Sequence, residues 1–295
     1  MARVHIPVLP DEVVRLLEPE RGGLFVDCTV GLGGHSRLLL ERGVSRLIGL
    51  DRDLSALSIA RDALAAWDER VELVHADYRQ LSAVLADRGI DRIDGALVDL
   101  GVSSLQLDAE GRGFSFRRDD PLDMRMDQSQ GETAAERLAR VEEKELADVI
   151  YAYGEERDSR RIARALVNAR AVRPLETTGQ VAEIVRRASR SKGWRRIDPA
   201  TRTFQALRIW VNGELDGLGE FLIGTIERLS TERRLAVIAF QSLDDRVVKN
   251  TFRQLQQREP ALARVLTKRP VVASEGEVSR NPRARSAKLR AVERT

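Results

Sequence analysis

The sequence has few of the residues that build metal centres and covalent cross-links. Of 295 residues, one is cysteine (Cys28) and three are histidine. A single cysteine excludes an intrachain disulfide framework and any multi-cysteine metal site. Three histidines also argue against a His-rich metal centre. We therefore expect a protein without a bound metal.

Long apolar runs are absent as well. No run approaches the roughly 20 residues that a membrane-spanning helix requires, and the first residues lack the apolar core of a signal peptide. The hydrophobic fraction of 42% is nevertheless enough for ordinary globular cores. These features indicate a soluble, cytoplasmic protein of a reducing compartment with no membrane partner. At about 100–200 residues per domain, the length favours two domains.

The near-neutral net charge of +3 conceals an uneven distribution of charge along the chain. Residues 1–100 hold more acidic than basic side chains, whereas residues 157–208 and 280–295 hold a clear excess of basic ones. Such asymmetry suggests a polyanionic partner for the later part of the chain. Ordinary solvated helix faces are the alternative interpretation of these basic segments.

Strand and helix patterns alternate over the first hundred residues. Segments with helical spacing separate buried-strand runs at residues 24–30, 46–51, 71–75 and 93–100. This alternation predicts βαβ units and a parallel sheet, with right-handed crossovers that place helices on both faces. The expected fold class is therefore α/β.

The pattern changes after Gly101. Residues 102–132 are polar and irregular, and the chain then has helical spacing without a strand signal to about residue 190. Further on, we expect a helix over residues 204–229 and a strand over 235–240. The interpretation is an inserted, mainly helical substrate-binding domain (105–204) within a core formed by residues 1–104 and 205–295.

A glycine-rich turn directly follows the first predicted strand. Residues 27–36 read DCTVGLGGHS, and Asp51 ends the second strand. Glycines at a strand-to-helix turn let a ligand approach the backbone, and an acidic side chain at the next strand end accepts hydrogen bonds from ribose hydroxyls. The dinucleotide pattern G-x-G-x-x-G is not met, because Ser36 occupies the third glycine position. The turn therefore predicts a nucleoside cofactor, with S-adenosylmethionine as the leading candidate.

Polar residues also follow the third and fourth predicted strands. Asp77 and Tyr78 come after the third strand, and Asp99 ends the fourth. Because the carboxyl ends of parallel strands form the ligand crevice of an open α/β sheet, we expect these side chains near the cofactor. Structural roles are the alternatives. Asp51 and Asp77 could cap the helices that follow them, and Tyr78 could be a packing residue.

Several longer motifs match a known family in the expected order along the chain. They are residues 5–9 (HIPVL), 27–36 (DCTVGLGGHS), 94–104 (DGALVDLGVSS), 112–116 (RGFSF), 121–127 (PLDMRMD), 153–157 (YGEER), 199–212 (PATRTFQALRIWVN) and 280–290 (RNPRARSAKLR). With these motifs the chain resembles the bacterial 16S ribosomal RNA (cytosine-N4)-methyltransferase family (RsmH/MraW). The motifs span almost the whole chain, and several are of unusual composition.

The resemblance implies a class I S-adenosylmethionine-dependent methyltransferase fold, a Rossmann-like sheet with an inserted helical domain. It implies transfer of a methyl group from S-adenosylmethionine to the exocyclic N4 amine of a cytidine in 16S rRNA, in the decoding region of the small ribosomal subunit. The residues at the family's cofactor-contacting positions are Gly33, Gly34, His35, Asp51, Tyr78, Asp99 and Gln106.

Two positions depart from the family's usual pattern. Leu105 stands where the family usually has proline, so we expect a looser loop before Gln106. Gln241 stands where the family usually has histidine. Because glutamine can hydrogen-bond but cannot replace histidine as a proton acceptor, we interpret this position as one that does not supply an obligatory base.

The chemistry requires help for a poor nucleophile, because the lone pair of a cytosine amine is delocalised into the ring. A site can accept a hydrogen bond from N4–H and can align the nitrogen, the methyl carbon and the sulfur. By analogy with other amine methyltransferases, Asp99 is the candidate catalytic residue. Direct contact with the cofactor is its rival role.

Basic residues around Trp194 are the candidates for RNA contact. Cationic side chains neutralise phosphates, and an indole ring stacks on a base. A solvated helix end with Trp194 packed on the domain is the alternative. The candidates are Arg187, Arg190, Lys192, Trp194, Arg195 and Arg196.

Two other functions are less well supported by the residues. A DNA cytosine-N4 enzyme is expected to carry an Asp/Ser-Pro-Pro-Tyr-type motif after the fourth strand, whereas residues 99–102 read DLGV. A non-enzymatic RNA-binding factor would not need the glycine turn with Asp51. The expected partner is therefore 16S rRNA within the small ribosomal subunit and not DNA. The sequence does not indicate the oligomeric state.

Overall fold

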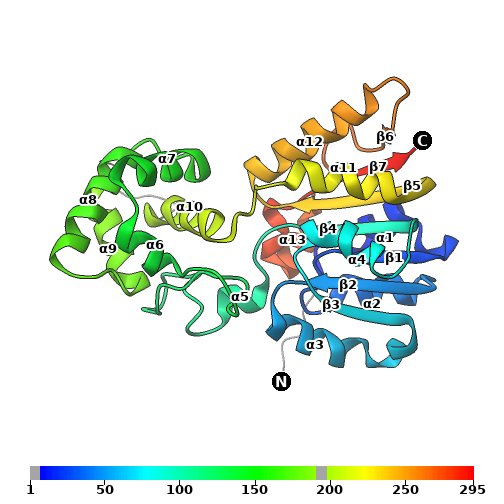
Figure 1. Ribbon diagram of the computed structural model, residues 1–295, viewed down its shortest axis with the longest axis horizontal. Coiled ribbons are helices and arrows are strands. Elements are labelled where there is room, and N and C mark those ends of the chain that lie inside the picture. Colours follow the sequence, from blue (N-terminus) through cyan, green and yellow to red (C-terminus); the bar gives the residue numbers. More distant parts are fainter. Residues whose placement is uncertain (1–6, 191–197) are drawn as a thin grey trace. The chain divides into compact units, whose positions relative to one another are not determined.

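The computed structural model describes residues 7–190 and 198–295 (Figure 1). The chain divides into two compact units. Unit 1 combines Met1–Gly101 with Leu215–Thr295, and unit 2 is Val102–Glu214. The division predicted from the sequence, after residues 104 and 204, has its second boundary inside helix α10 (Ala200–Asn212). That the inserted part binds the substrate stays a prediction.

Unit 1 is built on a seven-stranded sheet with the strand order β3-β2-β1-β4-β5-β7-β6. Strands β1 to β5 pair in parallel, and β7 is antiparallel to both β5 and β6. The strand order reverses between β1 and β4, which is where an open α/β sheet binds its ligand. The topology confirms the predicted α/β, Rossmann-like class. The strands are β1 (Leu24–Asp27), β2 (Arg46–Asp51), β3 (Val71–His75), β4 (Ile93–Asp99), β5 (Leu229–Ala239), β6 (Ala263–Val265) and β7 (Lys288–Arg294).

Two buried clusters lie on opposite faces of this sheet. Along β4, Val98 belongs to one cluster and Leu97 to the other, and successive residues of a strand point to opposite faces. Phe221 adds a helix side chain to the first cluster, and Leu39 adds one to the second. Helices therefore cover both faces. They are α1 (Pro10–Leu17), α2 (Gly34–Glu41), α3 (Leu54–Leu64), α4 (Leu81–Ala86), α11 (Leu218–Arg228), α12 (Ser242–Gln256) and α13 (Glu275–Arg280), with the 3₁₀ turns η1 (Pro19–Arg21), η2 (Ala65–Arg70), η3 (Tyr78–Gln80) and η4 (Pro282–Ser286).

The prediction of one helix over residues 204–229 is wrong. Helix α10 ends at Asn212 and α11 begins at Leu218. Between them, Gly213 (φ 57°) and Gly217 (φ 67°) adopt left-handed backbone conformations, which end a right-handed helix and which glycine tolerates because it has no Cβ. The interruption coincides with the passage of the chain from unit 2 back to unit 1.

Unit 2 is helical in its described residues and has a buried core of its own. Helices α7, α8, α9 and α10 pack around side chains such as Ile150, Leu166, Val181 and Leu207 (Figure 1). This agrees with the expected run of helices after residue 132. The helices are α5 (Ser104–Asp108), α6 (Ala134–Arg140), α7 (Glu143–Gly154), α8 (Ser159–Val172), α9 (Thr178–Ala188) and α10 (Ala200–Asn212).

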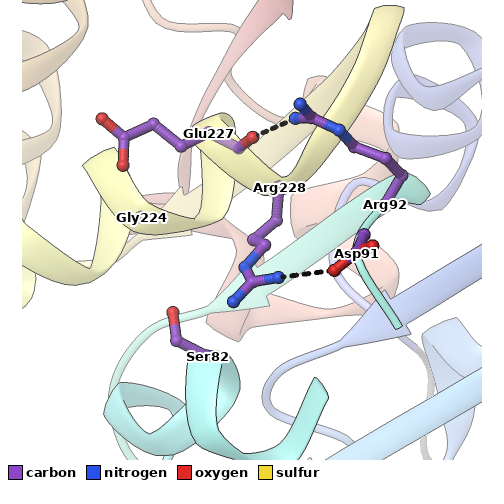
Figure 2. A pocket seen from close by; sticks show the side chains of 6 residues that line it. All are labelled: Ser82, Asp91, Arg92, Gly224, Glu227 and Arg228. Atoms are coloured by element: carbon purple, nitrogen blue, oxygen red, sulfur yellow. Dashed lines mark hydrogen bonds and ion pairs between the residues drawn. The ribbon is translucent and has the colours of Figure 1, made fainter. Parts of the chain in front are cut away.

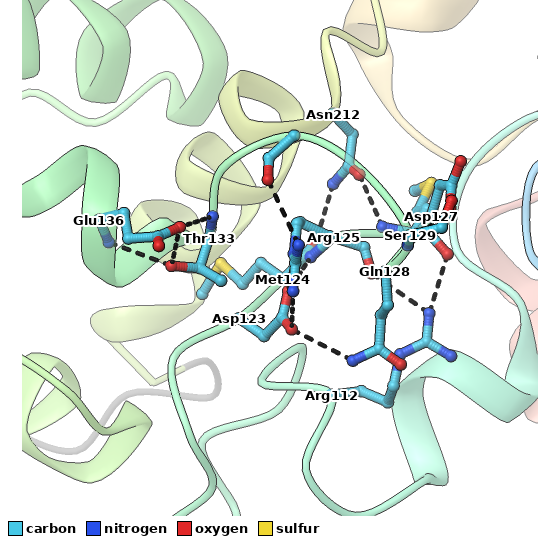
Figure 3. A network of polar contacts seen from close by, with 12 residues as sticks. Arg112, Asp123, Met124, Arg125, Asp127, Gln128, Ser129, Thr133, Glu136 and Asn212 are labelled. Atoms are coloured by element: carbon cyan, nitrogen blue, oxygen red, sulfur yellow. Dashed lines mark hydrogen bonds and ion pairs between the residues drawn. The ribbon is translucent and has the colours of Figure 1, made fainter.

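A polar network orders the loop before α6, as Figure 3 shows. The Asn212 amide bridges two points of this loop, because its Oδ1 accepts from Met126 N (2.8 Å) and its Nδ2 donates to Met124 O (2.8 Å). Met124 is fully buried and has a left-handed backbone (φ 62°). Asp123 accepts from Arg125 and Gln128. The loop is therefore held by side chains instead of by regular secondary structure.

Candidate functional site

The glycine turn connects the end of β1 to the first turn of α2. Gly31 (φ 54°) and Gly33 (φ 84°) both have left-handed backbones. A Cβ on Gly33 would also lie 3.3 Å from the Leu64 side chain, so glycine is required there on two grounds. Gly34 and His35 begin α2, whose first N–H groups have no partner within the helix. The turn thus combines accessible backbone with hydrogen-bond donors.

Asp51, at the carboxyl end of β2, holds this turn in place. Its Oδ2 accepts a hydrogen bond from Gly31 N (2.8 Å) and its Oδ1 accepts one from Asp53 N (2.9 Å). Burial raises the pKa of Asp51 to about 6. The alternative role as a helix cap is wrong, because Asp53 caps α3 by accepting from Ser55 N. Each Asp51 oxygen keeps a second acceptor position.

Asp99 ends β4 beside the first turn of α2. Its Oδ1 is buried and has no hydrogen-bond partner among residues 7–190 and 198–295, and its Oδ2 lies 3.8 Å from His35 Nδ1. His35 Nε2 lies 2.8 Å from the Val8 carbonyl oxygen, which can only accept, so the ring donates from Nε2. Burial lowers the pKa of His35 to about 4, so the ring is neutral and Nδ1 is an acceptor.

A second buried carboxylate, Asp27, acts on Asp99. Burial, and to a smaller extent the negative charge of Asp27, raises the pKa of Asp99 to about 8. Burial also raises the pKa of Asp27 to about 6, although Ser36 Oγ (2.6 Å) and Thr29 N (3.1 Å) donate to its oxygens. Thr29 Oγ1 in turn accepts from Asp99 N (2.6 Å). The edge of the sheet therefore gathers acidic groups that a cation would stabilise in their ionised form.

The sequence prediction missed the supporting residues of this edge, namely Asp27, Thr29, Ser36 and Asp53. Three of them lie in the motif at residues 27–36, which the sequence analysis interpreted mainly through its glycines. A carboxylate at the end of the first strand was the available signal. The hydrogen bond from Ser36 to Asp27 depends on how α2 packs beside β1, and the one from Asp99 to Thr29 depends on the pairing of β1 with β4, so spacing alone does not predict them.

Tyr78 lies in η3, after β3. Its ring packs against Phe221 with 4.6 Å between ring centroids, so it contributes to the core on one face of the sheet. Asp77 caps η3 in a capping box with Gln80 and pairs with Arg52 (3.2 Å) and Arg79 (2.7 Å). The packing and capping alternatives are therefore observed for these two residues, and both roles are compatible with a ligand contact.

Gln106 belongs to unit 2, in helix α5. It is buried and forms a capping box with Ser103, in which Gln106 Oε1 accepts from Ser103 N (3.0 Å) and Ser103 Oγ accepts from Gln106 N (3.2 Å). The spacing S-x-x-Q in residues 103–106 is a known signal for such a box, and the sequence prediction did not use it. The expected loosening at Leu105 is not observed, because this residue is helical.

The predicted RNA-binding residues fall partly outside the described structure. Lys192, Trp194, Arg195 and Arg196 lie outside the described residues. Arg187 ends α9 with 77% of its side chain exposed and pairs with Glu183. Arg190 is 79% exposed, and its Nε lies 3.9 Å from Asp158 Oδ1.

A separate cavity of about 640 Å³ lies in unit 1 (Figure 2). Asp91 and Arg92 precede β4 there, and Glu227 and Arg228 precede β5, so the cavity lies at the amino ends of these strands. The guanidinium of Arg92 donates to the Glu227 carbonyl, and Arg228 lies 3.8 Å from Asp91. Both arginines therefore make contacts at the C-terminal end of α11, at the end of the sheet opposite to Asp51 and Asp99.

The described residues contain neither a metal-type cluster nor a membrane-type helix. Across residues 7–190 and 198–295, His, Cys, Asp and Glu side chains do not gather in groups of three or more that could hold a metal ion. In the same ranges, the helices are all too short or too polar to cross a membrane.

Comparison with known proteins places the chain in one family. Residues 2–295 match the MraW methylase family. A relative named ribosomal RNA small subunit methyltransferase H, from Sorangium cellulosum, is 50% identical over 98% of this chain and 90% of its own. Relatives of the same name from Nitratidesulfovibrio vulgaris (99% of this chain, 86% of its own) and from a Geobacter species (98% of each) are 49% and 46% identical.

Solved structures match less closely. A putative methyltransferase from Streptococcus mutans, in complex with SAH, aligns with 98% of this chain and 100% of its own at a TM-score of 0.46 and 11% identity. This likeness adds nothing to the topology already described. The family match covers almost the whole chain, and with relatives near 50% identity the protein belongs to the MraW methylase family.

Proposed function

We propose that the protein methylates the exocyclic N4 amine of a cytidine in 16S rRNA, in the decoding region of the small ribosomal subunit, with S-adenosylmethionine as methyl donor. The relatives at 46–50% identity are named small-subunit rRNA methyltransferases. The observation that carries the proposal is the acidic edge made by Asp27, Asp51 and Asp99 at the carboxyl ends of β1, β2 and β4. The protein acts on RNA in this proposal, and DNA is not its substrate.

The residues of this edge fit S-adenosylmethionine. When bound, the cofactor supplies an electrophilic methyl group on a cationic sulfonium. Carboxyl groups with raised pKa values, about 6 for Asp51 and about 8 for Asp99, become more stable as carboxylates beside a cation. The partnerless Oδ1 of Asp99 is a buried acceptor that still needs a donor.

The other predicted cofactor residues have distinct tasks. Asp51 would accept hydrogen bonds from ribose hydroxyls with its remaining lone pairs. Gly33 and Gly34 leave the backbone at the start of α2 open to close approach. The Tyr78 ring, held by Phe221 on one side, would offer its remaining surface to an adenine. Gln106 would contact the cofactor from α5.

Asp99 is the proposed catalytic residue. Its ionised form would accept a hydrogen bond from cytosine N4–H and so localise the lone pair on the nitrogen that attacks. The neutral His35 ring donates no hydrogen bond to the Asp99 carboxylate, because its Nδ1 carries no proton. The Asp99 oxygens therefore stay available to the substrate amine. Orientation of the amine toward the methyl group supplies a further part of the rate gain. Extrusion of the target base costs a few kcal/mol, least for an unpaired base.

The experiment is methyl transfer from labelled S-adenosylmethionine to purified small subunits, protein-free 16S rRNA and DNA in parallel, with the modified nucleotide then mapped. We expect label on cytidine N4 in the small-subunit RNA, and loss of that label in Asp99→Ala. Asp91→Ala is the matched control, since Asp91 is an exposed carboxylate at the opposite end of β4. Label in DNA alone, or in no nucleic acid, would refute the proposal.

A further inference from the structure

Most of the arginines in unit 2 are held by partners within the protein. Along α8, Arg164 pairs with Glu143 (3.2 Å) and Arg170 donates to the Leu138 carbonyl. Elsewhere in unit 2, Arg208 makes a two-pronged pair with Glu214. These guanidinium groups stabilise the unit and are not available to a ligand without the loss of a partner.

Three arginines at the start of α8 behave differently. Arg157, Arg160 and Arg161 are exposed, and in the part of the chain that the structure describes their guanidinium groups have no hydrogen-bond or ion-pair partner. We call them the α8 arginine surface. Arg157 lies in the turn just before α8, whereas Arg160 and Arg161 lie in its first turn, four and three residues before Arg164 on the same side of the helix. Ile162 and Leu166 are buried.

Two acidic residues that flank Arg157, Glu156 and Asp158, do not neutralise this surface. Glu156 is buried, and its Oε1 accepts from the Asp158 backbone N–H (2.9 Å). Asp158 is itself directed to the end of α9, where its Oδ2 accepts from Arg190 N (2.9 Å). The remaining Glu156 oxygen lies 3.9 Å from Arg202. Each of these two carboxylates is therefore engaged by a group other than the three arginines.

The position of these cations is unfavourable for the helix itself. Positive charges in the first turn oppose the helix dipole, and like charges three or four residues apart repel each other. The first turn of α8 contains no acidic residue. A cluster that destabilises its own helix and has no partner among the described residues is explained most simply by a polyanionic ligand.

We propose that the α8 arginine surface binds phosphate groups of the substrate RNA. The inference rests on the proposed function, which supplies an RNA partner. Arginine suits this role because its planar donor groups engage phosphate oxygens in pairs. The hydrogen bond from Arg190 N to Asp158 fixes the end of α9 beside this surface.

The test compares Arg161→Glu with Arg173→Glu, which makes the same charge change at the other end of α8, where Arg173 is also exposed and unpaired in the described structure. In Arg161→Glu we expect the KM for small subunits to rise about tenfold and the salt slope of RNA binding to fall by about one. The KM for S-adenosylmethionine and the kcat at saturating subunits stay unchanged. The Tm does not fall, since acidic residues suit a helix N-terminus. Arg173→Glu changes the KM for subunits less than about twofold.

The alternatives give distinct results. If the protein methylates subunits but Arg161→Glu and Arg173→Glu have equal KM values for them, the α8 arginine surface does not bind the substrate. The proposed function would then stay intact. If Arg161→Glu weakens binding of subunits but leaves binding of protein-free 16S rRNA unchanged, the surface contacts an acidic ribosomal protein. That result would contradict binding of RNA phosphates. If the unmodified protein methylates no RNA, the proposed function fails. Binding of protein-free 16S rRNA by the same variants then tests the surface alone.

Discussion

When Asp99 is ionised, His35 Nδ1 and Asp99 Oδ2 face each other at 3.8 Å as two hydrogen-bond acceptors. The proton of the His35 ring is committed to the Val8 carbonyl, so the pair lacks a donor of its own. A proton on Asp99, or a donor brought by a ligand, relieves this arrangement. Binding of a ligand that donates to Asp99 can therefore replace the proton that Asp99 otherwise holds.

The first prediction concerns Asp99→Asn and pH. The Asp99 pKa is about 8 in the folded protein, against an ordinary value near 4 when unfolded. Between these values the folded protein holds a proton that the unfolded chain has released, so its free energy of unfolding falls as pH rises. Asp99→Asn lacks this loss. Relative to the unmodified protein, we expect the variant to gain about 3–4 kcal/mol of stability between pH 5 and pH 8 without cofactor.

Urea unfolding at the two pH values measures this difference. Asp51 also has a raised pKa, about 6, but it titrates in both proteins and cancels in the comparison. Asp27, with a pKa of about 6, is coupled to Asp99 and contributes to the difference. Methyl transfer by Asp99→Asn should fall steeply at both pH values, because an amide is not a carboxylate. Parallel stability curves for the two proteins would show that Asp99 is ionised throughout.

A second prediction is that Asp51→Ala lowers the affinity for S-adenosylmethionine at least about tenfold, the loss of one or two hydrogen bonds to a charged group. The affinity for RNA should stay within about twofold. Asp62→Ala, on the exposed face of α3, removes the same charge nearby and serves as the control. Calorimetry with the cofactor alone decides it. An unchanged dissociation constant would remove Asp51 from the site.

The third prediction separates backbone strain from crowding at Gly33. Gly33→Ala and Gly89→Ala both place an alanine at a left-handed position, with φ of 84° and 64°. Each should cost about 1–2 kcal/mol of folding stability. An added Cβ meets the Leu64 side chain only at Gly33, while nothing lies within 4 Å at Gly89. Gly33→Ala alone should therefore also weaken cofactor binding. Equal cofactor affinity in both variants would contradict this.

The fourth prediction concerns the loop that Asn212 holds. Asn212→Ala removes the bonds to Met126 N and Met124 O and should cost about 2–3 kcal/mol, since both backbone groups lose their partner. Hydrogen exchange at the Met126 amide and proteolysis of the loop should both become faster. Gln130→Ala, which removes an exposed contact with Asp127, is the control. If exchange at Met126 is as slow in Asn212→Ala as in that control, the loop is held by other contacts.

The sequence predicted the sheet of unit 1 well, because buried strands and their glycine turns are local signals. It did not predict the boundary between two helices whose apolar patterns run into each other. The apolar spacing of α10 and α11 continues through Gly213 and Gly217, and their left-handed backbones are set by the return of the chain to unit 1. The cap of α3 was ambiguous between Asp51 and Asp53, two residues apart in the sequence.

The candidate site was predictable in its residues but not in its protonation. Asp51 and Asp99 follow from their places at strand ends. The neutral state of His35 and the raised pKa of Asp99 depend on burial and on Asp27, which only tertiary packing provides. The α8 arginine surface was hidden for the same reason. Arg157 and Arg160 resemble Arg164 in the sequence, and only the partners in the fold distinguish them.

The pairing of β4 with β5 has a consequence for folding while the chain is being synthesised on the ribosome. All of unit 2 is synthesised between these two strands. During that interval β4 presents an open edge with Leu97 and Val98, residues that are fully buried in the finished sheet. An unpaired apolar edge invites association with other chains. Unit 2 has its own core and can fold in the meantime, before β5 is available to pair with β4.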